Sequence, residues 1–184
     1  MSKEILNLII DSNNFTVGGG SASALAGAMA AGLVGMVARL SLKKPVGLSE
    51  MEYKKIIKEA DELALKLQEG AAKDTEAYLL IKNAYALKKE TEEEKSIRAK
   101  AISDAGVAAA SVPRDNALMC KRVNELACNL VDCSNPAASS DLACGIFLSD
   151  TGVEGCILNV EANLSLIKDE EIIQQMKDSI ENLK

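Results

Sequence analysis

The chain of 184 residues is acidic, with a net charge of −6, and it contains no histidine, no tryptophan and three prolines. The missing histidine excludes Ser-His-Asp triads, histidine metal sites and imidazole catalysis, and an acidic chain without a basic block disfavours a nucleic-acid partner. Apolar residues make up 48% and aromatic residues 3% of the chain. The abundance of Ala, Leu, Glu and Lys predicts an all-α bundle of about six to eight helices in one domain over residues 1–184. Because a core poor in aromatic residues tends to be thin, we also expect an oligomer.

The first half of the chain centres on a glycine loop and the helix behind it. A short amphipathic helix over Lys3–Ile10 precedes the loop Thr16–Ser21, and residues 21–40 form a helix of almost only small side chains, with Ser21 as a plausible N-cap. Rows of Ala and Gly at i, i+4 let other backbones approach closely, and a helix N-terminus can hold an anion. The segment is long enough to span a membrane. Ala and Gly insert weakly, however, so we expect a buried central helix and no membrane partner.

Capping boxes mark the next two helices, Ser49-x-x-Glu52 and Thr91-x-x-Glu94. The first helix runs to Tyr85, either as one helix or as two that break near Gly70. The second is kinked or ended at Pro113.

The last part of the chain begins at a turn over Cys133–Pro136. Ser139, Ser140 and Asp141 then offer N-cap oxygens for a further helix, and Asp169–Leu183 has the pattern of a final amphipathic helix. The five cysteines have no Cys-x-x-Cys spacing, and no secretory signal is visible. These features predict reduced thiols, mostly in the core, of a cytoplasmic protein.

One acidic residue breaks the helical pattern. Asp74 lies seven residues after Leu67 and seven before Ile81, and therefore on the apolar stripe. A carboxylate there should be partnered, or its pKa should rise. A structural role, such as pairing with an internal arginine, and a functional role carry equal weight at this point.

Other polar residues lie on otherwise apolar faces: Asn135, Asp141, Asn159 and Asn163. A helical scaffold with a buried carboxylate and several amides suits a neutral or anionic heterocycle, with acid–base chemistry by Asp. The glycine loop alone is a weak signal, because it lacks the spacing of a phosphate-binding motif.

These residues resemble one known family. Thr16-Val17-Gly18-Gly19-Gly20-Ser21 is similar to the Thr-Pro-Gly-Gly-Gly-Ser opening of the cyclodeaminase/cyclohydrolase domain in the formiminotransferase-cyclodeaminase family. Further matches are Asp74-Thr-Glu-Ala77-Tyr78 to Asp-x-x-Ala-Phe, Asn135 with Ser140-Asp141 to Gly-Asn…Ser-Asp, and Asn159-Val160…Asn163-Leu164 to Asn-Val-x-x-Asn-Leu. Val112-Pro113 and the patch Glu94-Lys95…Arg98 also fit. The matches cover nearly the whole chain in the right order.

The resemblance implies an all-α homodimer that acts on a tetrahydrofolate derivative without metal or cofactor. The implied reactions are cyclodeamination of 5-formiminotetrahydrofolate and hydrolysis of 5,10-methenyltetrahydrofolate. Asp74 and Asp141 are the predicted catalytic carboxylates. The predicted substrate-binding residues are Gly18, Gly19, Gly20, Ser21, Lys43, Lys44, Asn135, Ser140, Asn159 and Asn163. Within this set the glycine loop and the two lysines would hold folate carboxylates, and the amides would bind the pterin edge.

Two departures from the family pattern bear on these expectations. Val17 replaces a proline, which loosens the loop, and Ala72 stands where some members have a second aspartate. If that second aspartate is essential for deamination, Ala72 favours the cyclohydrolase reaction or the use of another acid. The competing interpretation is a non-catalytic helical module, in which the small-residue helix only builds an oligomer interface.

Overall fold

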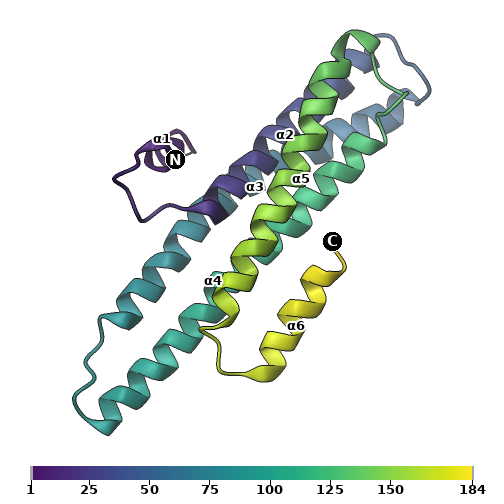
Figure 1. The fold of residues 1–184 in the computed structure, drawn as a ribbon. Coiled ribbons are helices and arrows are strands. Elements are labelled where there is room, and N and C mark those ends of the chain that lie inside the picture. Colours follow the sequence, from purple (N-terminus) through teal and green to yellow (C-terminus); the bar gives the residue numbers. More distant parts are fainter. Residues whose placement is uncertain (1, 184) are drawn as a thin grey trace.

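The computed structural model describes residues 2–183, and within that range the chain folds into helices without a strand. Figure 1 shows their order and arrangement. The elements are Ser2–Ile10 (α1), Gly19–Leu42 (α2), Glu50–Tyr85 (α3), Glu92–Cys128 (α4), the 3-10 turn Pro136–Ala138 (η1), Ser139–Leu164 (α5) and Glu170–Glu181 (α6). The predicted all-α bundle is therefore confirmed, and so is the approximate number of helices.

Both capping boxes begin helices as predicted. The hydroxyls of Ser49 and Thr91 accept hydrogen bonds from the N–H groups of Glu52 and Glu94, and each glutamate side chain accepts from the capping residue's N–H. Helix α3 continues unbroken through Gly70. A Cβ at that position would lie 2.0 Å from Asn116 Oδ1, so this glycine is needed for the contact between α3 and α4.

Two predicted N-caps are wrong. Helix α2 begins two residues before Ser21, with Gly18 as its N-cap, so the Ser21 side chain lies inside the first turn and reaches α3 instead. Helix α5 continues directly from η1 and has Ala138 at its N-cap position, which places Asp141 in the first turn of the helix. The preceding turn already supplies hydrogen-bond acceptors at this end, and the first is the side-chain oxygen of Asn135, which accepts from the N–H of Ala137.

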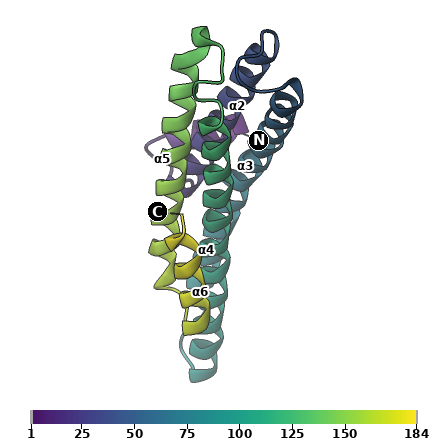
Figure 2. The same ribbon diagram turned by 90° about the vertical axis from the view of Figure 1, so that its right-hand side faces the viewer.

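Helix α2 packs against α3, α5 and α4, and the four helices together form a bundle (Figures 1 and 2). Its small residues permit close packing: a Cβ at Gly27 would lie 2.3 Å from Cys120 Sγ, and one at Gly152 of α5 would lie 2.7 Å from the same sulfur. Within residues 2–183, α2 is the one helix that is long and apolar enough to cross a membrane, but 56% of its most apolar window is buried in the bundle. The predicted packing of this small-residue helix within the bundle is thus confirmed.

The cysteines divide between core and surface, and all five thiols are free. Cys120 and Cys156 are fully buried, whereas Cys128 and Cys144 are exposed, so the expected core role holds for only part of the set. A hydrogen bond with Cys120, and then burial, raise the pKa of the Cys156 thiol, which keeps it protonated and unreactive.

The bundle is elongated, and its two ends are built from different connections (Figure 1). The α2–α3 connection and the α4–α5 connection meet at one end, and the α3–α4 connection lies at the other. Because α2 begins part-way along the bundle, the glycine loop opens beside the middle of α3 and the second half of α5. Helix α1 packs there through Ile5, which clusters with Val17 of the loop and Ala71 of α3.

Candidate functional site

A small groove forms where the glycine loop meets α3 and α5. Its volume is about 170 Å³, and we call it the Asp74 groove. It brings together predicted site residues that are up to 145 positions apart in the sequence. It is lined by Phe15, Thr16, Gly18, Gly19, Gly20, Asp74, Tyr78, Ile81, Ala109, Asn159, Ala162 and Asn163.

The Asp74 carboxyl group lies against the N-terminus of α2. Asp74 Oδ2 is 2.8 Å from the Ser21 hydroxyl, and a Cβ on Gly20 would lie 2.3 Å from Asp74 Oδ1. Only glycine therefore lets the carboxyl group approach this helix end. The group that lies against the start of α2 in this chain is therefore the Asp74 side chain itself.

The environment of Asp74 makes its carboxyl group easier to protonate than that of an exposed aspartate. Burial raises the pKa of Asp74, and hydrogen bonds from the side chain and backbone of Ser21 lower it by less. The Ser21 hydroxyl has one proton, yet it lies 2.9 Å from the carbonyl of Ala71 as well as 2.8 Å from Asp74. If Asp74 is protonated it donates to Ser21, which then donates to Ala71, so every partner is satisfied. A carboxyl group whose pKa is raised in this way can act as a general acid or base more readily than an exposed aspartate.

Two amides on α5 form the opposite wall of the groove. Pro113 lacks the N–H that would bond to the carbonyl of Ala109 four residues earlier, and the side chain of Asn163 donates to that carbonyl at 3.0 Å. Asn163 also donates to Asn159 O at 2.8 Å, and Asn159 donates to Gly155 O at 2.7 Å. Both amide nitrogens are thereby anchored, and the amide oxygens are left to accept from a ligand.

The other predicted site residues lie at the far end of α2 and α5. Lys43 and Lys44 follow α2, and Ser140 and Asp141 are in the first turn of α5. Along α5, Asp141 is 18 residues before Asn159, or ~27 Å at 1.5 Å per residue. A single chain therefore does not bring this second group to the Asp74 groove.

Asn135 has structural contacts at that same end. Its N–H donates to the Ser41 hydroxyl at 2.8 Å, and its side-chain oxygen accepts from Ala137 N at 3.0 Å. These bonds fix the α4–α5 connection to the end of α2.

Sequence reasoning missed Phe15 and Tyr78 as groove residues. Phe15 precedes the glycine loop and is 82% exposed, and Tyr78, one turn after Asp74, is 41% exposed. In a chain with only two Phe and three Tyr, exposed aromatic rings beside a glycine loop were an available signal of ligand stacking. Among the described residues, no group of three or more Cys, Asp or Glu side chains is arranged to hold a metal ion.

Comparison with known proteins places the chain among folate enzymes. The formiminotransferase-cyclodeaminase family matches residues 4–182. A methenyltetrahydrofolate cyclohydrolase from Methylorubrum extorquens is 32% identical over 169 residues, which cover 91% of this chain and 81% of that protein. A porcine formimidoyltransferase-cyclodeaminase is 27% identical over 175 residues, which cover 95% of this chain but 32% of the larger protein.

A solved structure agrees with both sequence relatives. The formiminotetrahydrofolate cyclodeaminase from Thermotoga maritima superposes with a TM-score of 0.83 at 30% identity, covering 98% of this chain and 86% of that one. The match extends over nearly all of the helices that form the Asp74 groove. The predicted resemblance is confirmed, and the chain belongs to the formiminotransferase-cyclodeaminase family.

Proposed function

We propose that the chain is a one-carbon folate enzyme that uses Asp74 to move a proton at the carbon between N5 and N10 of tetrahydrofolate. The reaction either hydrolyses 5,10-methenyltetrahydrofolate or forms it from 5-formiminotetrahydrofolate. The names of the two relatives at 30–32% identity support this chemistry. The observation that carries the role of Asp74 is its raised pKa in a groove whose opposite wall is two amides.

For hydrolysis, a water molecule attacks the methenyl carbon and forms a C–O bond. Asp74 accepts the proton that this water loses, and the product is a tetrahedral carbinolamine. N5 then takes the proton from Asp74, the hydroxyl proton passes to solvent water, and the carbon–N5 bond breaks, which leaves the formyl group on N10. One proton is released overall, and Asp74 carries the proton that N5 receives.

For cyclodeamination, N10 attacks the protonated formimino carbon. Asp74 takes the proton from N10 and gives it to the amino group on the same carbon. That group leaves as ammonia, and the methenyl cation remains. The same carboxyl group thus serves both reactions, because each passes through a tetrahedral carbon flanked by heteroatoms.

The remaining groove residues fit the binding of a pterin. The free amide oxygens of Asn159 and Asn163 can accept hydrogen bonds from ring N–H groups, and Tyr78 and Phe15 offer faces for stacking. Proton transfer by a carboxyl group needs neither metal nor redox cofactor, so we propose that none takes part.

We also propose that the enzyme is a cytoplasmic homodimer in which a second copy completes the site. The groove, at about 170 Å³, is small for a ligand pocket, and the second group of predicted residues lies ~27 Å away along α5. Helices α2 and α5 connect the Asp74 groove with this second group, and both expose large apolar side chains: Met29 and Met36 on α2, and Phe147 and Leu158 on α5. Antiparallel packing of two copies along this face would bring Asn135, Ser140 and Asp141 of one copy to Asp74 of the other.

The dimer has a direct test with two inactive variants. Mixing Asp74→Asn with Asp141→Asn and allowing subunits to exchange should restore about a quarter of wild-type activity, because half of the dimers are mixed and each has one intact site. No restoration, with exchange verified, would mean that the two residues do not combine across copies.

The central test follows the absorbance of the methenyl group. Growth from 5-formiminotetrahydrofolate identifies a cyclodeaminase, and decay above the spontaneous rate identifies a cyclohydrolase. Asp74→Asn should keep the fold and the stabilisation of the protein by 5-formyltetrahydrofolate, but should lower kcat by roughly 10²–10⁴-fold. Unchanged turnover would remove Asp74 from the mechanism. No thermal shift of wild-type protein with the folate analogue would favour the non-catalytic helical module.

A further inference from the structure

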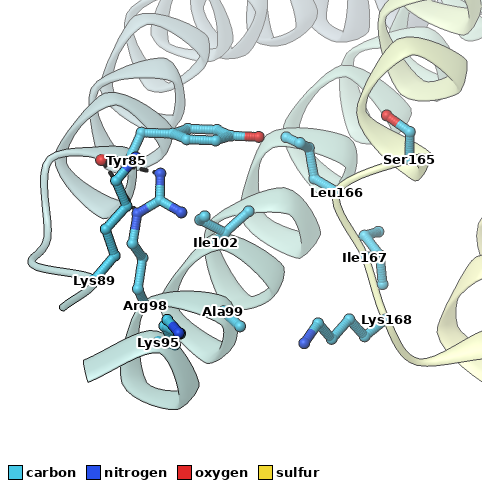
Figure 3. A pocket seen from close by; sticks show the side chains of 10 residues that line it. All are labelled: Tyr85, Lys89, Lys95, Arg98, Ala99, Ile102, Ser165, Leu166, Ile167 and Lys168. Carbon is cyan, nitrogen blue, oxygen red and sulfur yellow. Dashed lines mark hydrogen bonds between the residues drawn. The ribbon is translucent and has the colours of Figure 1, made fainter. Parts of the chain in front are cut away.

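We propose that a second, cationic pocket next to the Asp74 groove binds the glutamate carboxylates of the folate substrate. This proposal rests on the proposed function and adds a subsite to it. The basic pocket is defined by Tyr85, Lys89, Lys95, Arg98, Leu166 and Lys168, and its volume is about 490 Å³. Figure 3 shows these side chains at the end of α3, the start of α4 and the α5–α6 connection.

The arginine of this pocket is held in place before any ligand arrives. Arg98 Nε and Nη2 donate to the carbonyl of Tyr85 at 3.3 and 3.2 Å, and its guanidinium lies 5.2 Å from the centroid of the Tyr85 ring. Figure 3 shows the Tyr85 hydroxyl extending across the pocket toward Leu166. Since Arg98 pairs with no carboxylate of the described chain, Nη1 is left to donate to an anionic ligand.

Three lysines add positive charge around the guanidinium. Within residues 2–183, Lys89 and Lys168 form no ion pair, and the Lys168 side chain extends over the pocket toward Ala99 (Figure 3). Lys95 pairs with Glu92 at 2.6 Å, which reduces its contribution. A protein with a net charge of −6 therefore gathers at least three cations without carboxylate partners at one pocket. Concentrated positive charge of this kind attracts a multivalent anion.

The basic pocket continues from the Asp74 groove along the same helices. On α3, Ile81 lines the groove and Tyr85, four residues later, lines the pocket. On α4, Ala109 lines the groove and Ile102 lines the pocket. Seven residues correspond to about two turns or ~11 Å, comparable to the reach of a p-aminobenzoyl group and its glutamate. Ile81 and Ile102 provide apolar surface for the aromatic ring between the two ends.

The cations first expected to hold the glutamate are less suited to it. Lys43 and Lys44 are exposed and lie at the other end of α2, and the N-terminus of α2 already faces Asp74. In an antiparallel dimer, a partner copy would bring its own lysines toward the groove. The experiment must therefore separate these lysines from the basic pocket.

The test compares a substrate with and without its glutamate. We would measure kcat and KM of wild type, Arg98→Ala and Lys168→Ala with methenyltetrahydrofolate and with methenyltetrahydropteroate, which ends at the benzoate. Each variant should raise KM for the glutamate-bearing substrate by about tenfold, leave its kcat unchanged, and alter neither constant for the pteroate. Lys88→Ala is the control, because it removes one positive charge from the α3–α4 connection, next to Lys89, but Lys88 does not line the pocket.

Several results would overturn the proposal. Equal KM changes with both substrates would mean a structural effect, and no change would mean that the pocket takes no part in binding. An effect confined to Lys43→Ala and Lys44→Ala would move the glutamate to those lysines. If the wild type turns over neither substrate, the proposed function fails. The subsite then still requires a larger thermal shift with 5-formyltetrahydrofolate than with its pteroate analogue, and equal shifts would reject it.

Discussion

The contact between Gly20 and Asp74 can be tested with a single methyl group. Gly20→Ala places a Cβ 2.3 Å from Asp74 Oδ1 and 2.7 Å from Asp74 Cγ, whereas ordinary contacts begin near 3.4 Å. The carboxyl group must therefore move by roughly 1 Å, and a misplacement of that size can lower the rate by about 10²-fold. Crowding should cost about 1–3 kcal/mol of stability, offset by about 0.5–1 kcal/mol that alanine gains over glycine in a helix.

The matched control is Gly18→Ala in the same loop. Gly18 has a φ of −129°, which any residue adopts, and a Cβ there would meet no atom within 4 Å. We expect Gly18→Ala to keep the Tm and most of kcat, while Gly20→Ala loses kcat much more than stability. The assay is the methenyl absorbance under single-turnover conditions, with Tm measured in parallel. If Gly20→Ala and Gly18→Ala show the same kcat, the approach of Asp74 to the start of α2 is not what activates it.

Three further outcomes follow from individual contacts. Because the pKa of Asp74 is raised, the folded state binds more protons than the unfolded state above the ordinary aspartate pKa of about 3.9, and the ionisation of Asp74 therefore lowers stability as the pH rises through that window. Asp74→Asn should raise Tm at pH 8, and this gain should vanish on acidification. A difference in Tm that does not depend on pH would contradict the raised pKa. Asn163→Ala leaves the carbonyl of Ala109 without a hydrogen-bond donor and should lower the free energy of unfolding in urea by about 1–3 kcal/mol. Pro113→Ala restores the backbone N–H donor, so removing Asn163 in that background should lower the free energy of unfolding by less. Ser49→Ala removes the cap of α3 and should cost about 1 kcal/mol without changing kcat, and a lost turnover would be unexpected.

The sequence by itself determined the helices and the single residues most worth testing. Capping boxes and apolar periodicity depend on contacts within a few residues, so the starts of α3 and α4 could be identified without tertiary information. Asp74 was identifiable for the same reason, because its place on an apolar stripe is a local property. The predicted N-cap at Ser21 is wrong, because the Ser21 hydroxyl forms hydrogen bonds with residues of α3 and not with the first turn of its own helix.

Only the tertiary structure decided which of the candidate residues share a site. The carboxyl group of Asp74, the glycine loop and the amides of Asn159 and Asn163 meet because three helices converge there, and no spacing in the sequence encodes that convergence. The same geometry places Asp141 at the far end of α5 and Arg98 in the basic pocket, because a straight helix fixes distance at 1.5 Å per residue. Local patterns thus supplied the chemical groups, and the packing of rigid helices assigned them to the groove, the basic pocket or the opposite end of the bundle.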